Sequence, residues 1–396
     1  MAVSAQGNHL TIQVNIGSET SSVVLSAPGV ESLTLQSQLN QGRLSELRIR
    51  MRDQLQLFAR LAESSFELRG SQRWEQVDAA MQCLRRLGSM FGSALFKYGD
   101  VPRVEQFCRD ACRWTKKLGQ PPRIELIVGN YALAPFEFIP FFQRKSPGKI
   151  TKPEELEDEA RSYPAFVGII KRTIHSAPEP ASRLAGRPEL RAKVFQYAPL
   201  LAVTRVGPEL EKCGVTLSPN FPQKVFLPRD FESRMMHIFR TSKEQIFYFG
   251  CHCDTTDMDA MNHHVTLMDT AESEERQLSL GTIDLDLYEN GPRAPHGPLV
   301  FMNACGGADV MPSGLKSFPE VFLTGNFAGY IGTETIIPDT TAAAFATTFF
   351  KTFLRGETLG ESMLTARRRL LDRGDPLGIL YTAYASSDLL ALRTQP

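Results

Sequence analysis

Two short apolar runs, each leading to a reactive side chain, constrain this chain most. The first run, Ile246 to Phe249, leads to His252, and the second, Leu299 to Met302, leads to Cys305. Short apolar runs bounded by turn residues are typical of buried parallel strands. Because chemistry gathers at the carboxyl ends of strands in open parallel sheets, the two runs predict that His252 and Cys305 lie at one edge of a sheet.

The spacing of these two residues indicates the kind of chemistry. His252 precedes Cys305 by 305 − 252 = 53 residues, close to the roughly 50 residues between the catalytic His and Cys of caspases. The segment Ala304-Cys305-Gly306-Gly307 also fits A-C-[RQG]-G, the local caspase pattern. The sequence therefore predicts a cysteine protease of that kind.

The residue types suit nucleophilic catalysis. A thiol becomes a good nucleophile when it is deprotonated, and an imidazole can act as its general base or as the ion-pair partner of the thiolate. Gly306 and Gly307 let the backbone turn sharply and leave the Cys305 thiol accessible. The backbone N–H of Cys305 and one from the His252 loop can form an oxyanion hole. The alternative for Cys305 alone is a small buried packing residue, but strand ends, spacing and glycines together favour catalysis.

Composition narrows the class of protein. The 396 residues include 42% apolar and 22% charged residues, which is ordinary for a globular protein. Lys+Arg and Asp+Glu are both 44, so a nonspecific nucleic-acid binder is disfavoured. The N-terminus does not resemble a signal peptide, and no apolar stretch approaches the ~18 residues that span a bilayer. Seven irregularly spaced cysteines argue against a disulfide framework and predict a reducing, cytoplasmic setting.

The organisation of the chain predicts an α/β fold. A β-hairpin is expected over residues 9–26, then two amphipathic helices with apolar stripes over 44–61 and 74–95, and a third helix over 103–118. Strands are expected at 124–128, 200–206, 224–227, 246–249, 299–302 and 328–331, and surface loops at 149–163 and 176–188. Helices are expected at 231–240, from Asp339 as N-cap, and from the capping box Thr358-x-x-Glu361. Alternating strands and helices predict a mostly parallel sheet covered on both faces.

A zinc site is a rival interpretation of the first motif. Cys251, His252 and Cys253, with His263 and His264 downstream, supply zinc-type ligands within a short window. However, adjacent residues on a strand point to opposite faces, and the C-x₂₋₄-C spacing of zinc ribbons is absent. Cys251 and Cys253 are therefore expected to pack beside the histidine, and no metal or organic cofactor is expected.

The motifs resemble those of a known family. The order Phe-Gly-Cys-His, Asn-Ala-Cys-Gly-Gly, a glycine-rich strand ending in Gly332-Thr333-Glu334, and the closing segment over residues 375–381 are similar to a CHAT domain. CHAT domains belong to the caspase- and separase-related cysteine peptidases of clan CD. Residues 125–137, which include the turn Pro135-Phe136-Glu137, resemble the early strand and turn of that family. The resemblance covers about residues 120–395.

The resemblance implies a fold, an activity and a site. It implies a caspase-like α/β sandwich over residues 121–396. The residue pattern itself predicts a hairpin over 1–30 and a helical region over 31–120, and this helical region stands where the family often has a tetratricopeptide array. It implies His252 as base and Cys305 as nucleophile, with the backbone N–H groups of Cys253 and Cys305 as oxyanion hole. Cys253 stands where the family usually has glycine. Asp309, four residues past the nucleophile, is a candidate for a pocket that accepts a basic P1 side chain, although a solvated loop carboxylate is the alternative.

The expected function is a cytoplasmic cysteine endopeptidase that hydrolyses a specific protein. The family resemblance implies bacterial antiviral defence or regulated cell death, with a substrate such as a pore-forming protein or a zymogen. An activating partner is expected at the helical region, and neither nucleic-acid binding nor membrane insertion is expected. The acidic segment over residues 269–275 is either a regulatory loop or a solvated one. The alternative function is a catalytically idle CHAT-like scaffold that binds a partner protein.

Overall fold

The computed structural model describes most of the chain in two compact units. The described residues are 9–16, 19, 21–37, 39–113, 119–128, 136–142, 148–174, 181–184, 189–221, 230–254, 260–268, 275–290, 297–304 and 317–391. Unit 1 consists of residues 1–176, 312–314 and 367–379, and unit 2 of residues 177–311, 315–366 and 380–396.

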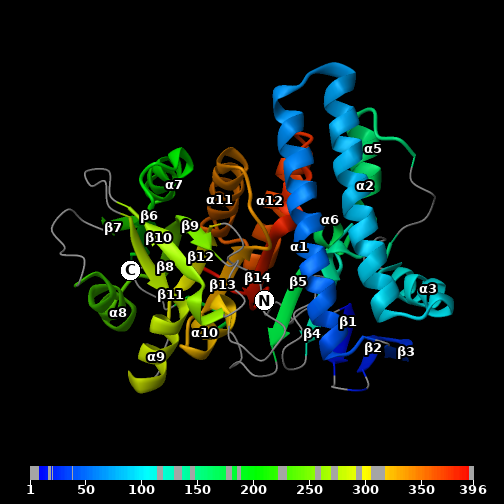
Figure 1. The fold of residues 1–396 in the computed structure, drawn as a ribbon, viewed down its shortest axis with the longest axis horizontal. Coiled ribbons are helices and arrows are strands. Elements are labelled where there is room, and N and C mark those ends of the chain that lie inside the picture. Colours follow the sequence, from blue (N-terminus) through cyan, green and yellow to red (C-terminus); the bar gives the residue numbers. More distant parts are fainter. Residues whose placement is uncertain are drawn as a thin grey trace. The chain divides into compact units, whose positions relative to one another are not determined.

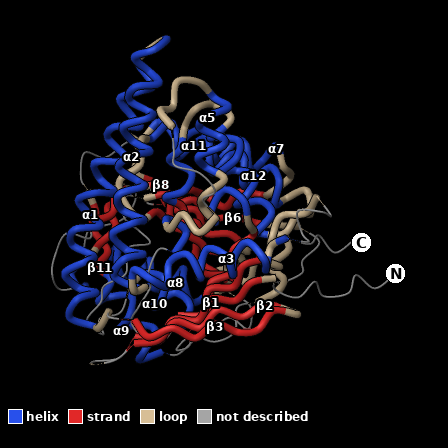
Figure 2. Tube along the Cα trace, turned by 90° about the vertical axis from the view of Figure 1, so that its right-hand side faces the viewer, coloured by secondary structure: helices blue, strands red, loops and turns tan. Residues whose placement is uncertain are grey.

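Unit 1 contains a five-stranded sheet in the order β3-β2-β1-β4-β5. Its first half is an antiparallel meander of β1 (Leu10–Ile16), β2 (Ser21–Ala27) and β3 (Val30–Ser37), and Figure 2 shows these strands side by side. Parallel pairing then joins β1 to β4 (Arg123–Val128) and β4 to β5 (Ile169–Ile174). The N-terminal strands thus belong to the same sheet as a strand more than a hundred residues later.

Two long helices form an antiparallel pair in unit 1 (Figure 1). They are α1 (Gln41–Ser64), capped by Asn40, and α2 (Gly70–Leu95). The Cys83 thiol donates to the Gln54 carbonyl at 3.3 Å, which fixes their register. A Cβ at Gly88 would lie 2.2 Å from the Phe138 carbonyl oxygen, so α2 approaches the 3-10 helix Phe136–Phe138 as closely as only glycine permits. The shorter helices of this unit are α3 (Val101–Ala111), α5 (Pro153–Ala160) and α6 (Pro164–Val167).

A buried ion cluster lies in the core of unit 1. The guanidinium of Arg172 on β5 donates two hydrogen bonds to the Glu137 carboxylate, with Nε at 2.9 Å from Oε1 and Nη2 paired with Oε2. The two side chains are 1% and 2% exposed. Arg367 is also buried and donates to the Ala165 carbonyl at 3.3 Å. Burial lowers the pKa of Arg367 to about 10, although the nearby Glu137 charge acts in the opposite direction.

His9 makes the stability of unit 1 sensitive to acid. The backbone N–H of Arg123 donates to its Nδ1 at 3.0 Å, and partial burial, followed by the charge of Arg123, lowers its pKa below 6.5. The neutral ring therefore stabilises the fold above its ordinary pKa, and this contribution is lost as pH falls through the lowered pKa. We expect His9→Gln to lose less unfolding free energy than the unchanged chain between about pH 7.5 and pH 5. Urea unfolding at both pH values measures this, and equal losses would contradict it.

Unit 2 contains a six-stranded sheet in the order β14-β13-β12-β8-β6-β7. Five strands run parallel, and β14 is antiparallel to β13 at one edge. A second sheet of three strands, ordered β11-β10-β9, is antiparallel. The bounds are β6 Arg191–Gln196, β7 Thr216–Phe221, β8 Ile246–Gly250, β9 His252–Asp254, β10 His264–Leu267, β11 Arg276–Ser279, β12 Leu299–Asn303, β13 Gly329–Thr333 and β14 Tyr381–Ala385.

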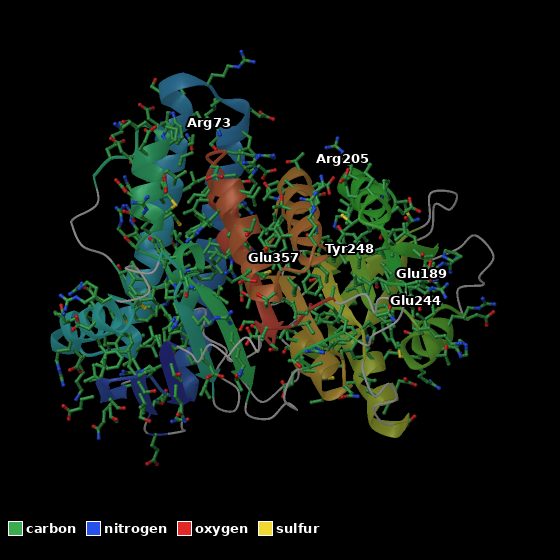
Figure 3. The ribbon with its side chains drawn as sticks, turned by 180° about the vertical axis from the view of Figure 1, so that it is seen from behind. Arg73, Glu189, Arg205, Glu244, Tyr248 and Glu357 are labelled. Carbon is green, nitrogen blue, oxygen red and sulfur yellow. The ribbon has the colours of Figure 1, made fainter. Side chains whose placement is uncertain are left out.

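Helices cover both faces of the six-stranded sheet (Figure 1). One face is covered by α8 (Phe231–Thr241), α9 (Leu280–Asn290) and α10 (Phe318–Thr324), and the other by α7 (Leu201–Lys212) and α11 (Asp339–Phe353). Because alternate residues of a strand face opposite sides, Phe247 packs on Phe239 of α8, whereas Tyr248, which is labelled in Figure 3, packs on Phe350 of α11. All five residues of β8 and of β12 are buried, as expected for central parallel strands.

Helix α12 (Leu359–Leu371) divides between the two units. It begins with the predicted capping box, in which the Glu361 N–H donates to Thr358 Oγ1 at 3.3 Å and the Thr358 N–H donates to Glu361 Oε2 at 3.0 Å. Its last turns lie in unit 1, where Arg368 Nε donates to the Phe166 carbonyl at 3.0 Å. In the part of the chain that the structure describes, no helix combines the length and the apolar character needed to cross a membrane.

The predicted fold class is confirmed: an α/β architecture with a mostly parallel six-stranded sheet flanked by helices, together with an N-terminal helical pair. Three local predictions are wrong. The N-cap of α11 is Pro338, and Asp339 is the first residue of the helix. The strand expected at 200–206 lies in α7, where Val206 and Leu210 are buried at helical spacing, and the loop expected at 149–163 contains α5. The strand expected at 224–227 lies outside the described residues, and the division at residues 30 and 120 stays a prediction.

Candidate active site

The register of β8 and β12 brings the ends of these two strands to the same level of the sheet. These strands are parallel neighbours, paired from Leu299 opposite Ile246 to Asn303 opposite Gly250. His252 follows Gly250 by two residues, and Cys305 follows Asn303 by two. Because Gly250 and Asn303 are paired, β8 and β12 end at the same edge of the sheet, and each of the two residues follows its strand at the same distance in sequence. Cys305 lies outside the described residues, as does Asp309, so this equality rests on the strands before them.

Asn303, the last residue of β12, holds the end of this strand in place. Its side chain is buried, and its Nδ2 donates to Tyr248 Oη at 2.9 Å and to the Ala342 carbonyl at 3.2 Å. Its Oδ1 accepts a hydrogen bond from Tyr381 Oη at 2.5 Å. These partners come from β8, α11 and β14. Four elements therefore meet at one amide, two residues before Cys305.

A further hydrogen bond holds Ala304, the residue after Asn303. Thr333 Oγ1, at the end of β13, donates to the Ala304 carbonyl at 2.7 Å, and the Thr333 side chain is buried. The chain is thus held by side chains on both residues that lead to Cys305. Buried and fully bonded polar groups of this kind rigidify a site.

Replacing Asn303 by leucine should destabilise unit 2. The buried hydroxyls of Tyr248 and Tyr381 would each lose the hydrogen bond to Asn303, and a hydrogen bond lost from a buried polar group costs about 1–3 kcal/mol, so we expect a loss of about 2–4 kcal/mol of unfolding free energy. Tyr381→Phe, which removes one of the bonds, should cost about 1 kcal/mol. Urea unfolding of both variants measures the difference. A loss below about 0.5 kcal/mol in Asn303→Leu would contradict this role.

His252 is exposed at the beginning of β9, whereas Cys251 before it is buried and Cys253 after it is half-buried. This alternation follows from the pleat of a strand, and it presents the imidazole to solvent while the neighbouring thiols pack. Cys253 pairs with Val265 of β10, and His252 with Thr266. The expected oxyanion-hole role of the Cys253 N–H stays a prediction.

Two residues that sequence reasoning missed lie beside the histidine. The Tyr197 ring packs against the His252 imidazole, with ring centroids 4.5 Å apart and an interplanar angle of 66°. Tyr197 Oη donates to Glu275 Oε1 at 2.7 Å. This hydrogen bond, more than any other effect, raises the pKa of Tyr197, so the phenol keeps its proton at neutral pH. The sequence offered no signal for Tyr197, because the strand that it directly follows, β6, was not predicted.

The zinc interpretation finds no ligand set in the described part of the chain. There, no three His, Cys, Asp or Glu side chains gather as metal ligands do. His263 is buried, while Nδ1 of His264 lies 3.1 Å from the Asn262 carbonyl. The strand pleat separates Cys251 from His252, as the sequence analysis expects.

Comparison of the sequence with known proteins finds similarity over part of the chain. No protein-family model matches the chain. A probable protease of Vitiosangium sp. is 38% identical over 99 residues, which are 24% of this chain and 13% of that protein. The match thus spans a small fraction of the relative's length.

A solved structure shows a similar fold. A chain of the separase–securin complex of Saccharomyces cerevisiae matches with a TM-score of 0.50 and 8% identity, over 95% of this chain and 30% of that chain. A chain of the complex of Porphyromonas gingivalis RgpB pro- and mature domains matches with a TM-score of 0.44 and 11% identity, over 77% of this chain and 72% of that one. Separase belongs to the group that the sequence motifs resemble. The fold is the caspase-like α/β fold predicted from the sequence, and the Vitiosangium relative is named a probable protease.

Proposed function

We propose that this chain is a cysteine endopeptidase in which Cys305 is the nucleophile and His252 the general acid and base. The observation that carries the proposal is the register of β8 and β12, because Gly250 lies opposite Asn303 and the two residues follow at equal offsets. A His and a Cys that leave one sheet edge side by side have the arrangement that thiol activation requires. The protease-like fold and the relative named a probable protease support the same class.

The chemistry follows from these roles. The Cys305 thiolate attacks the scissile carbonyl carbon, and the carbonyl electrons move to oxygen, where the N–H groups of Cys253 and Cys305 would stabilise the charge. Collapse of the intermediate breaks the C–N bond, and the His252 imidazolium gives its proton to the leaving amine. His252 then removes a proton from water, which attacks the thioester. The acid product and the thiol are released, and no metal or organic cofactor takes part.

The substrate we propose is a specific protein, such as a pore-forming protein or a zymogen, in bacterial antiviral defence or regulated cell death. The resemblance of the motifs to a CHAT domain supports this setting. Asp309 is proposed to favour a basic P1 side chain, because a carboxylate in a pocket pairs with Lys or Arg. The helical pair α1 and α2 in unit 1 is the proposed place for an activating partner.

New-terminus mass spectrometry on a bacterial proteome supplemented with candidate partner proteins tests the function. The unchanged chain is compared with Cys305→Ala, each with and without a chelator. We expect new N-termini with a shared P1 residue in the unchanged chain alone, and no effect of the chelator. Cleavage that persists in Cys305→Ala overturns the proposal. Partner binding with full biological function in that variant establishes the idle scaffold instead.

A further inference from the structure

Among the described residues, the ring of Tyr197 packs against the imidazole of His252. Within the described residues no hydrogen bond to the His252 ring occurs, and the side chain is exposed. An exposed imidazole without such a bond rotates freely unless a packed group restricts it. We infer that Tyr197 is a positioning residue that holds His252 in the orientation that the Cys–His pair needs; this inference rests on the function proposed above.

The backbone of Tyr197 is anchored to both sheets of unit 2. Its N–H donates to the Gly250 carbonyl at 2.7 Å, which extends the pairing of β6 with β8 by one residue. On the other side, the Met268 N–H donates to the Gln196 carbonyl at 3.0 Å, and the Ala198 N–H donates to the Met268 carbonyl at 2.9 Å. Tyr197 therefore sits where the end of β8 and the end of β10 converge. His252, the first residue of β9, follows Gly250 by two residues.

The far end of the Tyr197 side chain is anchored as well. Its hydroxyl donates to the carboxylate of Glu275, the residue before β11, and β11 is itself paired with β10. The ring is consequently held at its backbone and at its phenol oxygen. A ring held at both ends has little freedom to move, and the imidazole packs against it edge-on, with an interplanar angle of 66°. The three-stranded sheet thus holds the Tyr197 ring against His252.

The Tyr197 ring affects the reaction by restricting the orientation of His252. An imidazole kept near its productive rotamer loses less entropy when it pairs with the thiolate or protonates the leaving amine. Edge-to-face aromatic pairs are worth about 0.5–1.5 kcal/mol, which corresponds to a rate effect of about 2- to 12-fold. We expect this range for the loss of the ring, and a smaller loss, about 2-fold, when only the hydroxyl is removed.

Alkylation of Cys305 by iodoacetamide tests the inference without a known substrate. The rate constant is measured by peptide mass spectrometry between about pH 5.5 and pH 8.5 for the unchanged chain, Tyr197→Leu, Tyr197→Phe and His252→Ala. An imidazolium beside the thiol favours the thiolate, so we expect His252→Ala to slow alkylation at neutral pH and to move its pH profile upward. Tyr197→Leu should slow it about 2- to 12-fold and move the profile in the same direction. Tyr197→Phe should show the smaller effect.

The outcomes separate this inference from the proposed function. Slower alkylation in His252→Ala with an unaltered rate and profile in Tyr197→Leu overturns the role of Tyr197 and leaves the Cys–His pair intact. An unaltered rate in His252→Ala overturns the pair, and the inference with it. A purely structural role of Tyr197 would lower the unfolding midpoint and leave the pH profile where it is, which also overturns the inference.

A spectroscopic measurement reports the contact itself. An imidazole proton beside an aromatic ring shows a ring-current shift, so the Hε1 resonance of His252, assigned by its absence in His252→Ala, should move in Tyr197→Leu and keep most of its position in Tyr197→Phe. Identical positions in all the Tyr197 variants would show that the two rings are apart in solution, and would overturn the inference whatever the enzyme does.

Discussion

Removing the imidazole of His252 is expected to lower kcat/KM for cleavage of a protein substrate by about 100- to 10,000-fold. Without this base the thiol of Cys305 is mostly protonated at neutral pH, and the leaving amine has no proton donor. The loss should appear mainly in kcat, because both functions act on the bonds being made and broken. His252 is exposed, so His252→Ala should fold with an unfolding midpoint close to that of the unchanged chain.

The measurement is steady-state cleavage of a substrate found by its new termini. Cys305→Ala should be inactive, and a double variant of His252 and Cys305 should be no worse, since residues that act as a unit are not additive. His264 is a matched control, because it lies on the neighbouring strand β10 and its Nδ1 lies within hydrogen-bond distance of the Asn262 carbonyl. His264→Ala should retain cleavage. Activity within about 3-fold of the unchanged chain in His252→Ala would contradict the assignment of the base.

The second large effect is expected on stability, from Glu137→Gln in unit 1. This change leaves the buried guanidinium of Arg172 without the Glu137 carboxylate and removes a negative charge that acts on Arg367. Breaking a buried ion pair on one side costs about 3–5 kcal/mol, because an uncompensated charge stays in the core. We expect a loss of this size in the unfolding free energy, measured in urea.

Two comparisons make this prediction specific. Glu157→Gln removes the carboxylate of an exposed pair with Arg161, whose side chains are 63% and 57% exposed, and should cost about 0.5 kcal/mol or less. The double variant Glu137→Met with Arg172→Met removes both charges of the pair, and it should recover part of the stability lost in Glu137→Gln. A cost in Glu137→Gln no larger than in Glu157→Gln would show that the buried pair is energetically unimportant.

The sequence predicted the strands of the candidate site because their pattern is local. Ile246 to Phe249 and Leu299 to Met302 are continuous apolar runs, and a run of that kind is buried on both faces in any fold that accepts it. The capping box at Thr358 and Glu361 was predictable for the same reason, since both partners lie within one turn. The prediction was wrong where the same short apolar pattern suits both a strand and a helix. The apolar residues of α7 also suit a strand, and only burial at helical spacing decided between them.

The groups that hold the site could not be predicted, because they converge from distant segments. Asn303 bonds to Tyr248, 55 residues earlier, and to Tyr381, 78 residues later. Tyr197 and Glu275 are likewise 78 residues apart. The motif at Glu137 was visible in the sequence, but its buried partner Arg172 was not, since a polar residue inside a strand normally indicates the solvent face. Side chains that are paired only by tertiary packing have no fixed spacing in the sequence, so the sequence does not predict them.

The contribution of Tyr381 to the amide of Asn303 bears on how such a molecule is made. Ribosomes release Cys305, the proposed nucleophile, long before they release β14, so a nascent chain that has reached Cys305 still lacks the hydroxyl that bonds to Asn303 Oδ1. The hydrogen bonds at the end of β12 are completed only when synthesis has passed residue 381. A product truncated before that residue would carry Cys305 without the Tyr381 hydroxyl that holds Asn303.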